Sequence, residues 1–155
     1  MKRVTILFLQ KDDQVLLAMK KRGFGVGKWN GVGGKVEDGE TAAQAAVREC
    51  QEEIGVTPHT PKLVAKLDFF DQADPGFHHQ ASVFTSKSWD GDPHETEEMR
   101  PQWFAQAAVP YTDMWAADRL WIPEVLAGAL LTGRITFNGE KLVQHSFTPV
   151  HRIDE

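Results

Sequence analysis

The chain has 155 residues, of which 41% are hydrophobic and 25% charged, and its mean hydropathy is −0.37. This length suits one domain with its own hydrophobic core, and this composition argues against both a disordered and a membrane-spanning protein. The formal net charge of −5 argues against a general DNA- or RNA-binding protein, which would need an excess of basic residues to neutralise phosphates, but it leaves small charged ligands open.

The start of the chain and its one cysteine indicate the compartment. The apolar run over residues 4–9 is short and gives way to a polar stretch from Gln10 without a small-residue cleavage site, so we interpret it as a strand and not as a signal peptide. Cys50 excludes an internal disulfide and any zinc site built from several cysteines. A single cysteine suits a reducing environment, and we expect a cytoplasmic protein.

The first part of the chain predicts two strands and a helix. Residues 3–10 and 14–20 are apolar and β-branched, with a polar turn between them, which predicts a pair of strands. A glycine-rich segment follows. The capping-box signature at Thr41 and the helix-ending residue Gly55 predict a helix over residues 42–54.

The rest of the chain predicts five more strands and a second helix. The predicted strands comprise residues 63–72, 78–87, 101–106, 134–138 and 142–149, the last two joined by a turn at Asn138-Gly139. The second helix is predicted from Asp118 to Leu131, ending near Gly133. We therefore predict one α+β domain over residues 1–155 with a mixed β-sheet.

Charge is segregated in the first third of the chain. Residues 20–35 carry five basic side chains and no acidic one, whereas residues 36–53 carry six acidic side chains and one basic one. Seven of the 13 glycines lie between Gly23 and Gly39, so the basic segment also has a flexible and poorly shielded backbone. This arrangement suits phosphate on the basic side and a divalent metal on the acidic side.

The first predicted helix carries three carboxylates, Glu49, Glu52 and Glu53, away from its apolar face. Their spacing stacks like charges within one turn, which costs stability unless a cation lies on them. Oxygen ligands on a rigid helix suit Mg²⁺ or Mn²⁺. The alternative is an ordinary solvated helix face, on which Arg48 pairs with Glu52.

A longer pattern includes these carboxylates. Gly34 is followed after five residues by Glu40, and after seven more by Arg48-Glu49-Cys50-Gln51-Glu52-Glu53-Ile54-Gly55-Val56. The pattern resembles the Nudix box, G-x5-E-x7-R-E-U-x-E-E-x-G-U with U aliphatic, and its one departure is Cys50, which packs as a small hydrophobe. The resemblance implies a Nudix hydrolase with the Nudix fold: an α/β/α sandwich, its mixed β-sheet packed between helices, that uses Mg²⁺, or Mn²⁺, to cleave a nucleoside diphosphate linked to another group.

The resemblance also implies roles within the motif. The implied metal-binding set comprises Gly34, Glu49, Glu52, Glu53 and Glu98. Arg48 would orient the carboxylates and Glu40 would support them, and Gly33 with its neighbour would let the backbone approach the phosphates. Glu53 is the first candidate for the base that activates water and Glu98 the second.

Segments outside the box resemble Nudix enzymes that hydrolyse oxidised purine nucleoside triphosphates. These segments are Gly23-Phe24-Gly25, Trp29-Asn30-Gly31-Val32-Gly33-Gly34-Lys35-Val36, Glu98-Met99-Arg100-Pro101-Gln102-Trp103-Phe104 and Asp113-Met114-Trp115, with Trp121. The implied nucleotide-binding set comprises Thr5, Lys20, Phe24, Asn30, Gly33, Gly34, Lys35, Phe69, Trp115 and Asp118. Aromatic faces in this set would stack on a purine, and an amide with a carboxylate would read the base edge.

Several of these residues also have an ordinary structural explanation. Phe24 and Trp115 fit core aromatics, and Asn30 fits a turn residue beside a glycine. Asp118 fits the N-cap of the second helix, and Glu98 fits one of several solvated acids.

Two residues depart from the resemblance. Ala117 stands where the family has the first of two neighbouring aspartates, so only Asp118 remains to read the base. A pair of carboxylates can share a proton and adapt to different bases, which puts broad base acceptance in doubt. His79 stands in place of an apolar methionine, where an imidazole would add polarity to the pocket, unless it faces solvent on its strand.

Three functions follow from this reading. The first is Mg²⁺-dependent hydrolysis of oxidised purine (deoxy)nucleoside triphosphates, such as 8-oxo-dGTP, to the monophosphate and pyrophosphate, which removes damaged nucleotides from the pool. The second is the same chemistry on an ordinary triphosphate, a dinucleoside polyphosphate or a nucleotide sugar, because the box acts on the diphosphate. The third is a non-catalytic nucleotide sensor. We expect a monomer or homodimer that binds a single nucleotide, and neither a nucleic acid polymer nor a membrane.

Overall fold

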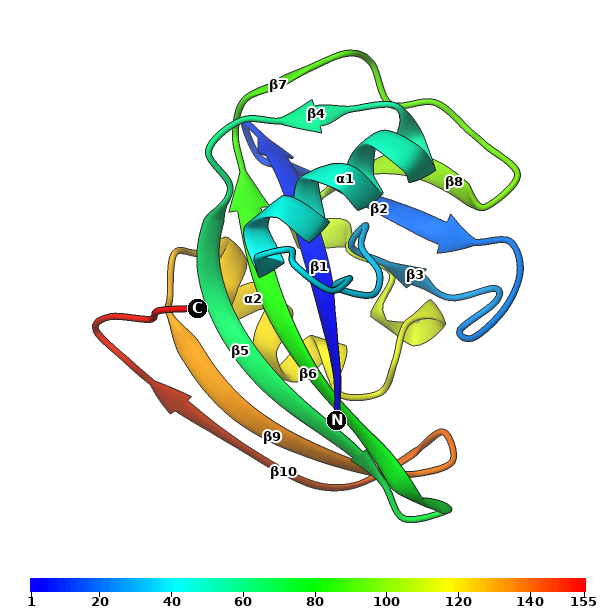
Figure 1. Ribbon diagram of the computed structural model, residues 1–155, viewed down its shortest axis with the longest axis vertical. Coiled ribbons are helices and arrows are strands. Elements are labelled where there is room, and N and C mark those ends of the chain that lie inside the picture. Colours follow the sequence, from blue (N-terminus) through cyan, green and yellow to red (C-terminus); the bar gives the residue numbers. More distant parts are fainter.

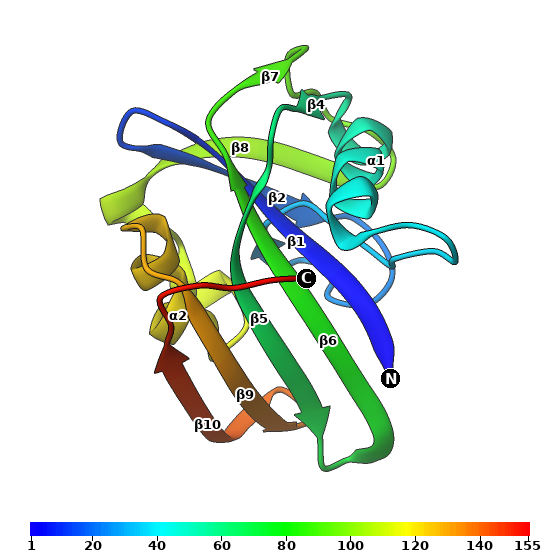
Figure 2. The ribbon, with the colours of Figure 1, turned by 60° about the vertical axis from the view of Figure 1, so that its left-hand side comes forward.

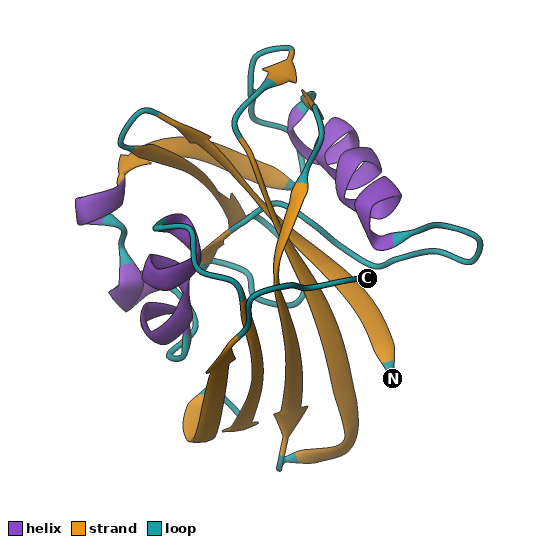
Figure 3. Ribbon diagram, turned by 90° about the vertical axis from the view of Figure 1, so that its left-hand side faces the viewer, coloured by secondary structure: helices purple, strands orange, loops and turns teal.

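The computed structural model describes residues 1–155. The chain folds into a mixed β-sheet with one helix on each face (Figure 3). The helices are α1 (Ala42–Ile54) and α2 (Asp118–Leu126), and two short 3-10 turns span Gln106–Ala108 and Tyr111–Asp113. The strands are β1 (Lys2–Lys11), β2 (Gln14–Lys20), β3 (Trp29–Asn30), β4 (Thr57–Pro58), β5 (Lys62–Asp71), β6 (Asp74–Ser86), β7 (Trp89–Asp90), β8 (Met99–Ala105), β9 (Leu131–Asn138) and β10 (Lys141–Pro149). The predicted α+β class is confirmed. No helix is both long enough and apolar enough to cross a membrane.

The sheet mixes parallel and antiparallel pairs. Its strand order is β10-β9-β5-β6-β1-β2-β3, and β8 also pairs with β2 (Figure 1). Strands β1 and β6 are parallel, as are β5 and β9, whereas the remaining pairs are antiparallel. Strands β4 and β7 form a separate two-stranded ribbon. The two parallel pairs join segments that are far apart in the sequence, and β9 lies between the edge strand β10 and β5.

The glycine-rich segment lies along β1 like an extra strand. Strands β1 and β2 pair only near their shared turn, where Gln10 lies opposite Val15. Beyond the turn, Val32 and Leu7 exchange two backbone hydrogen bonds of 2.7 and 2.9 Å, and the Thr5 N–H donates to the Gly34 carbonyl at 2.8 Å. The motif glycines are thus fixed against the edge of β1.

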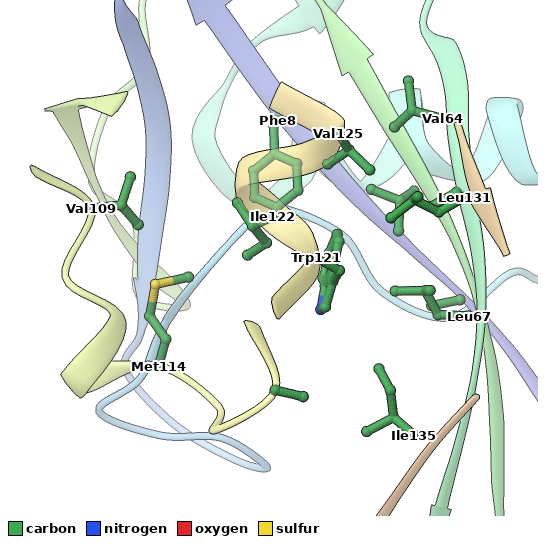
Figure 4. Packing of buried hydrophobic residues seen from close by; sticks show 14 of the residues in the cluster. Phe8, Val64, Leu67, Val109, Met114, Trp121, Ile122, Val125, Leu131 and Ile135 are labelled. Carbon is green, nitrogen blue, oxygen red and sulfur yellow. The ribbon is translucent and has the colours of Figure 1, made fainter. Parts of the chain in front are cut away.

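Two hydrophobic cores lie on opposite faces of the sheet. Neighbouring residues of a strand point to opposite faces, so Phe8 packs with Trp121 of α2, whereas Leu7 packs with the buried face of α1. Figure 4 shows the α2 core, in which the Phe8 and Trp121 rings lie 6.1 Å apart. In the α1 core Cys50 is fully buried, and burial raises the pKa of its thiol to about 12. Cys50 therefore packs as a small hydrophobe, as predicted.

Helix α1 is fixed at both ends. At its start the Thr41 hydroxyl accepts from the Gln44 N–H at 3.1 Å, and the Gln44 side chain accepts from the Thr41 N–H at 2.9 Å, which completes the predicted capping box. The last residues of the chain cross the sheet towards the same end (Figure 2), where the Glu155 carboxylate accepts from the Ala42 N–H at 2.7 Å. Gly55 ends the helix in a left-handed conformation.

The predicted end of the second helix is wrong. Helix α2 ends at Leu126 and not at Leu131, and a left-handed Gly128 with φ of +103° turns the chain. Leu131 instead begins β9, where it lies opposite Ala65 of the parallel strand β5. Gly133 lies within β9 and does not end a helix. Glycine suits this position because a Cβ would come within 2.7 Å of the Phe147 ring. Pairing with a distant strand thus overrides the local helical pattern.

Gly33→Ala is expected to destabilise the protein by about 3 kcal/mol or more, because overpacking against a fixed backbone has no cheap relaxation. A Cβ at Gly33 would lie 1.9 Å from the Thr5 carbonyl oxygen of β1. Chemical denaturation measures the loss. Gly76→Ala is the matched control, because its Cβ would meet nothing closer than 3.7 Å. Similar losses in the two variants would contradict the steric explanation.

Candidate active site

A cleft of roughly 730 Å³ lies on the α2 face of the sheet. Alternate residues of β1 and β6 form its floor, among them Val4, Ile6, His79 and Ala81, because side chains two apart in a strand share a face. The cleft is also lined by all ten residues of the predicted nucleotide-binding set: Thr5, Lys20, Phe24, Asn30, Gly33, Gly34, Lys35, Phe69, Trp115 and Asp118. The fold thus brings these residues together from distant parts of the sequence.

Aromatic side chains form one wall of the cleft. Phe24 and Trp115 stack with ring centroids 5.3 Å apart and planes inclined by 22°, and Trp115 meets the edge of Phe137 at 5.7 Å. Phe24 is 65% exposed, so the core-aromatic explanation is wrong for it, and Trp115 is only half-buried. Flat, partly exposed rings can stack on a purine.

Asp118 is a buried acid beside the cleft and does not cap helix α2. The N-cap is Ala117, and no side chain caps the helix there. Asp118 is 3% exposed, and its Oδ2 has no hydrogen-bond partner in the protein. Burial raises the pKa of this carboxyl to about 7, and the nearby Lys28 charge acts in the opposite direction. A buried polar atom without a partner is costly, which favours a ligand as its partner.

Asn30 and His79 add polar groups to the cleft. Asn30 lies in β3, opposite Ala18 of β2, so the turn explanation is wrong for it. Its Oδ1 accepts from the Gly31 N–H at 2.8 Å. His79 lines the cleft, and its ring stacks on Phe77 with centroids 4.0 Å apart. His79 is partly exposed within the cleft. Burial, the nearby Lys2 and the neighbouring His78 lower the pKa of His79.

Arg48 connects the acidic motif. Its guanidinium forms a bidentate pair with Glu40, at 2.7 and 2.9 Å, and donates to the Lys35 carbonyl at 3.0 Å. It also donates to Glu49 at 2.9 Å and to Glu52 at 3.2 Å. These bonds raise the pKa of Arg48 and hold that of Glu40 at about 2. The geometry matches the expected orienting contacts, and the Arg48–Glu52 pair of the alternative explanation is one bond among five.

Glu53 is the buried carboxylate of the motif. It is 8% exposed, and its Oε2 has no hydrogen-bond partner. Burial and the adjacent Glu49 raise the pKa of Glu53 to about 8, whereas Lys20 acts in the opposite direction. A Cβ on Gly34 would lie 2.6 Å from the carboxyl carbon of Glu49, so the glycine directly adjoins the carboxylates. Gly34 therefore links the motif to the cleft, which it also lines.

Glu98 is held by an arginine from outside the motif. It forms a 2.6 Å ion pair with Arg22 on the surface, and this pair lowers the pKa of Glu98. Its loop is tied to α1, because the Thr96 hydroxyl donates to the Glu53 carbonyl at 2.8 Å. No three His, Cys, Asp or Glu side chains form a group that could hold a metal ion. Arginines bind four of the carboxylates: Arg48 binds Glu40, Glu49 and Glu52, and Arg22 binds Glu98. The metal-binding set therefore stays a prediction.

Comparison with known proteins identifies the family. Residues 1–125 match the family model described as NUDIX domain. The chain belongs to the NUDIX family. It is 41% identical over 156 residues to the oxidized purine nucleoside triphosphate hydrolase of Danio rerio, covering 99% of this chain and 95% of the relative. It is 38% identical over 139 residues to the enzyme of the same name from Mus musculus, covering 90% and 88%.

A solved structure supports the Nudix fold. The crystal structure of a mutator MutT protein from Bacillus halodurans superposes with a TM-score of 0.83 at 27% identity, covering 95% of this chain and 97% of that one. The sequence prediction of a Nudix hydrolase with a mixed sheet between helices is confirmed.

Several residues of the Nudix cleft have no counterpart in the sequence predictions. Lys28, Phe77, Phe137 and Glu140 also line the cleft. Two of them could have been proposed from the sequence, because Lys28 belongs to the basic segment and Phe77 is two residues before His79 in the chain. Nothing in the sequence indicates Phe137 and Glu140, because the terminal hairpin reaches the cleft only through the pairing of β9 with β5.

Proposed function

We propose that this Nudix protein hydrolyses oxidised purine (deoxy)nucleoside triphosphates, such as 8-oxo-dGTP, to the monophosphate and pyrophosphate. The observation that carries the proposal is the single cleft, lined by all ten expected nucleotide-binding residues, that reaches the acidic motif at Gly34. Two relatives matched over nearly their full length are named oxidized purine nucleoside triphosphate hydrolases, which supports this substrate class.

The donor set of the motif suits Mg²⁺. Glu53 has an oxygen without a partner, and the adjacent Glu49 raises its pKa, so a cation bound at Glu53 would relieve both costs. Magnesium prefers such hard oxygen ligands. Glu49, Glu52 and Glu53 would hold it beside Gly34, and the bound ion would withdraw charge from the diphosphate and acidify water.

The remaining residues orient the substrate. Lys20 and Lys35 line the cleft near the motif glycines and neutralise phosphate charge. Glu53 Oε2, free of protein partners, would accept the proton of the attacking water once a bound cation had stabilised the ionised form of Glu53. Glu98 would first have to leave Arg22, so Glu53 remains the first candidate for the base. Phe24 and Trp115 stack on the base.

A second candidate is the same hydrolysis of a triphosphate that carries a different base. His79 and Ala117 favour it. The imidazole adds a polar group to the floor of the cleft, and the fully buried alanine leaves Asp118 as the single carboxylate beside the base. One carboxylate cannot share a proton with a neighbour to suit several base edges.

A pyrophosphate-release assay with Mg²⁺ tests both candidates. The substrates are 8-oxo-dGTP, 2-oxo-dATP, the ordinary triphosphates, a dinucleoside polyphosphate and a nucleotide sugar. We expect the highest kcat/KM for an oxidised purine triphosphate. A preference for an ordinary triphosphate would establish the second candidate, and turnover confined to the dinucleoside polyphosphate or nucleotide sugar would contradict both. Absence of turnover on every substrate would support a nucleotide sensor.

A further inference from the structure

An ion pair crosses the mouth of the cleft. The Lys28 ammonium, in the glycine-rich segment, lies 2.9 Å from a carboxylate oxygen of Glu140, in the turn between β9 and β10. The same ammonium lies 4.9 Å from the centre of the Trp115 ring. Both Lys28 and Glu140 line the cleft, and Glu140 is the more exposed, with 76% of its side chain accessible against 25% for Lys28.

The Lys28 charge also acts on Asp118. It favours the ionised form and so lowers the pKa of that carboxyl, against the larger opposite effect of burial. Yet the ion pair of Lys28 is with Glu140, and Asp118 Oδ2 has no partner. The other groups that face Asp118 are Tyr111, whose pKa is raised by burial and by Asp118, and Trp121. Lys28 is thus the cation that acts on Asp118, and it favours the ionised form less than the Trp115 backbone and the Trp121 side chain do.

We propose that Glu140 is a positioning residue that holds the Lys28 ammonium over Trp115 and away from Asp118, so that Asp118 meets the base as a neutral acid. A neutral carboxyl offers one donor and one acceptor to a base edge, whereas a carboxylate only accepts. Glu140 thereby selects bases that need a donor at this point. The consequence for the base rests on the proposed function, whereas the effect on Asp118 does not.

The cleft that Lys28 lines contains two further carboxylates, those of Asp71 and Asp118. Asp71 also lines it, but its Oδ1 already accepts from the Ala73 N–H at 2.9 Å and from the Gly139 N–H at 3.0 Å. Asp118 offers an oxygen with no such bonds. When the charge of Glu140 is removed, Lys28 therefore turns to Asp118 and stabilises its ionised form.

The first test is an NMR titration of the Asp118 carboxyl in the free protein, which needs no substrate. Glu140→Gln is expected to lower the midpoint by about one pH unit, a tenfold change in the neutral fraction at high pH. Glu140→Asp, which keeps the charge, restores the parent value. In a Lys28→Gln background, Glu140→Gln has no effect. Glu95→Gln, which removes a 2.6 Å surface ion pair with Lys21, is the control and leaves the midpoint unchanged.

Two results overturn the proposal. One is an unchanged Asp118 midpoint in Glu140→Gln. The other is a shift of equal size in the Lys28→Gln background, which would show that Glu140 acts directly through its own charge.

The second test measures the effect of Glu140 on base recognition through kcat/KM at two pH values. With the oxidised purine triphosphate that the parent prefers, Glu140→Gln is expected to lower kcat/KM about tenfold at pH 8 and about twofold at pH 6, in line with the neutral fraction of Asp118. An equal loss at both values overturns the link to base recognition. Failure of the proposed substrate class leaves the NMR result standing, so the two failures are distinguishable.

Discussion

Glu53→Gln is expected to lower turnover about a thousandfold or more, because it removes charge at the position that serves both metal and water. Stability is not expected to fall. Glutamine has the same shape, and it removes a buried negative charge that burial and Glu49 both disfavour. Pyrophosphate release with Mg²⁺ measures the first effect, and urea denaturation of the metal-free protein measures the second.

Glu98→Gln is the matched variant for this experiment. Because Glu98 pairs with Arg22 on the surface, its replacement is expected to cost much less activity than that of Glu53. If Glu53→Gln kept its rate within a fewfold of the parent while Glu98→Gln lost most of it, Glu98 would be the base. A large loss of stability in Glu53→Gln would show instead that the buried carboxylate supports the fold.

Asp118→Asn is expected to stabilise the protein at pH 8. The pKa of the buried Asp118 is about 7, against about 3.9 for an aspartate in an unfolded chain. Between these values the folded state binds more protons at Asp118 than the unfolded state, so the contribution of Asp118 to the free energy of unfolding is highest below about pH 4 and is lost as the pH rises through 7. Three pKa units correspond to a difference on the order of 4 kcal/mol. Asparagine is neutral at every pH, so the variant does not lose this free energy of unfolding as the pH rises.

The measurement is the free energy of unfolding between pH 4 and pH 9 for parent and variant. The control is Asp113→Asn, because Asp113 is exposed on the turn that precedes α2. We expect the control to keep the pH dependence of the parent and Asp118→Asn to reduce it, with the part due to the raised pKa of Glu53 remaining. Parallel curves for the parent and Asp118→Asn would show that Asp118 is ionised in the folded protein at pH 7.

Local patterns predicted the parts of the fold that depend on neighbours in the sequence. The capping box at Thr41 and the terminal glycine Gly55 defined helix α1 to the residue. The family resemblance gave Arg48 and Glu40 separate roles beside the carboxylates, and their direct contact was found only in the structure. Local patterns failed at Leu131, where pairing with β5 decides the structure.

The cleft was predicted by resemblance, and its electrostatics were not. Residues such as Thr5, Asn30 and Trp115 could be collected into one site only because the chain resembles a known family. The partners of its charged residues stayed hidden: Arg22 with Glu98, and Lys28 with Glu140. These pairs join surface loops whose distance depends on the complete fold, and exposed charges leave no periodic signal in the sequence.

The burial of Cys50 bears on the conditions in which this protein would work. Oxidants such as peroxide attack the thiolate of an accessible cysteine. Cys50 is fully enclosed in the α1 core, and the raised pKa of its thiol keeps it protonated at physiological pH. Its neighbours on the same helix are the carboxylates of the motif. A protein that removes oxidised nucleotides thus keeps its one thiol, in the helix that carries those carboxylates, out of reach of the oxidants that create its substrates.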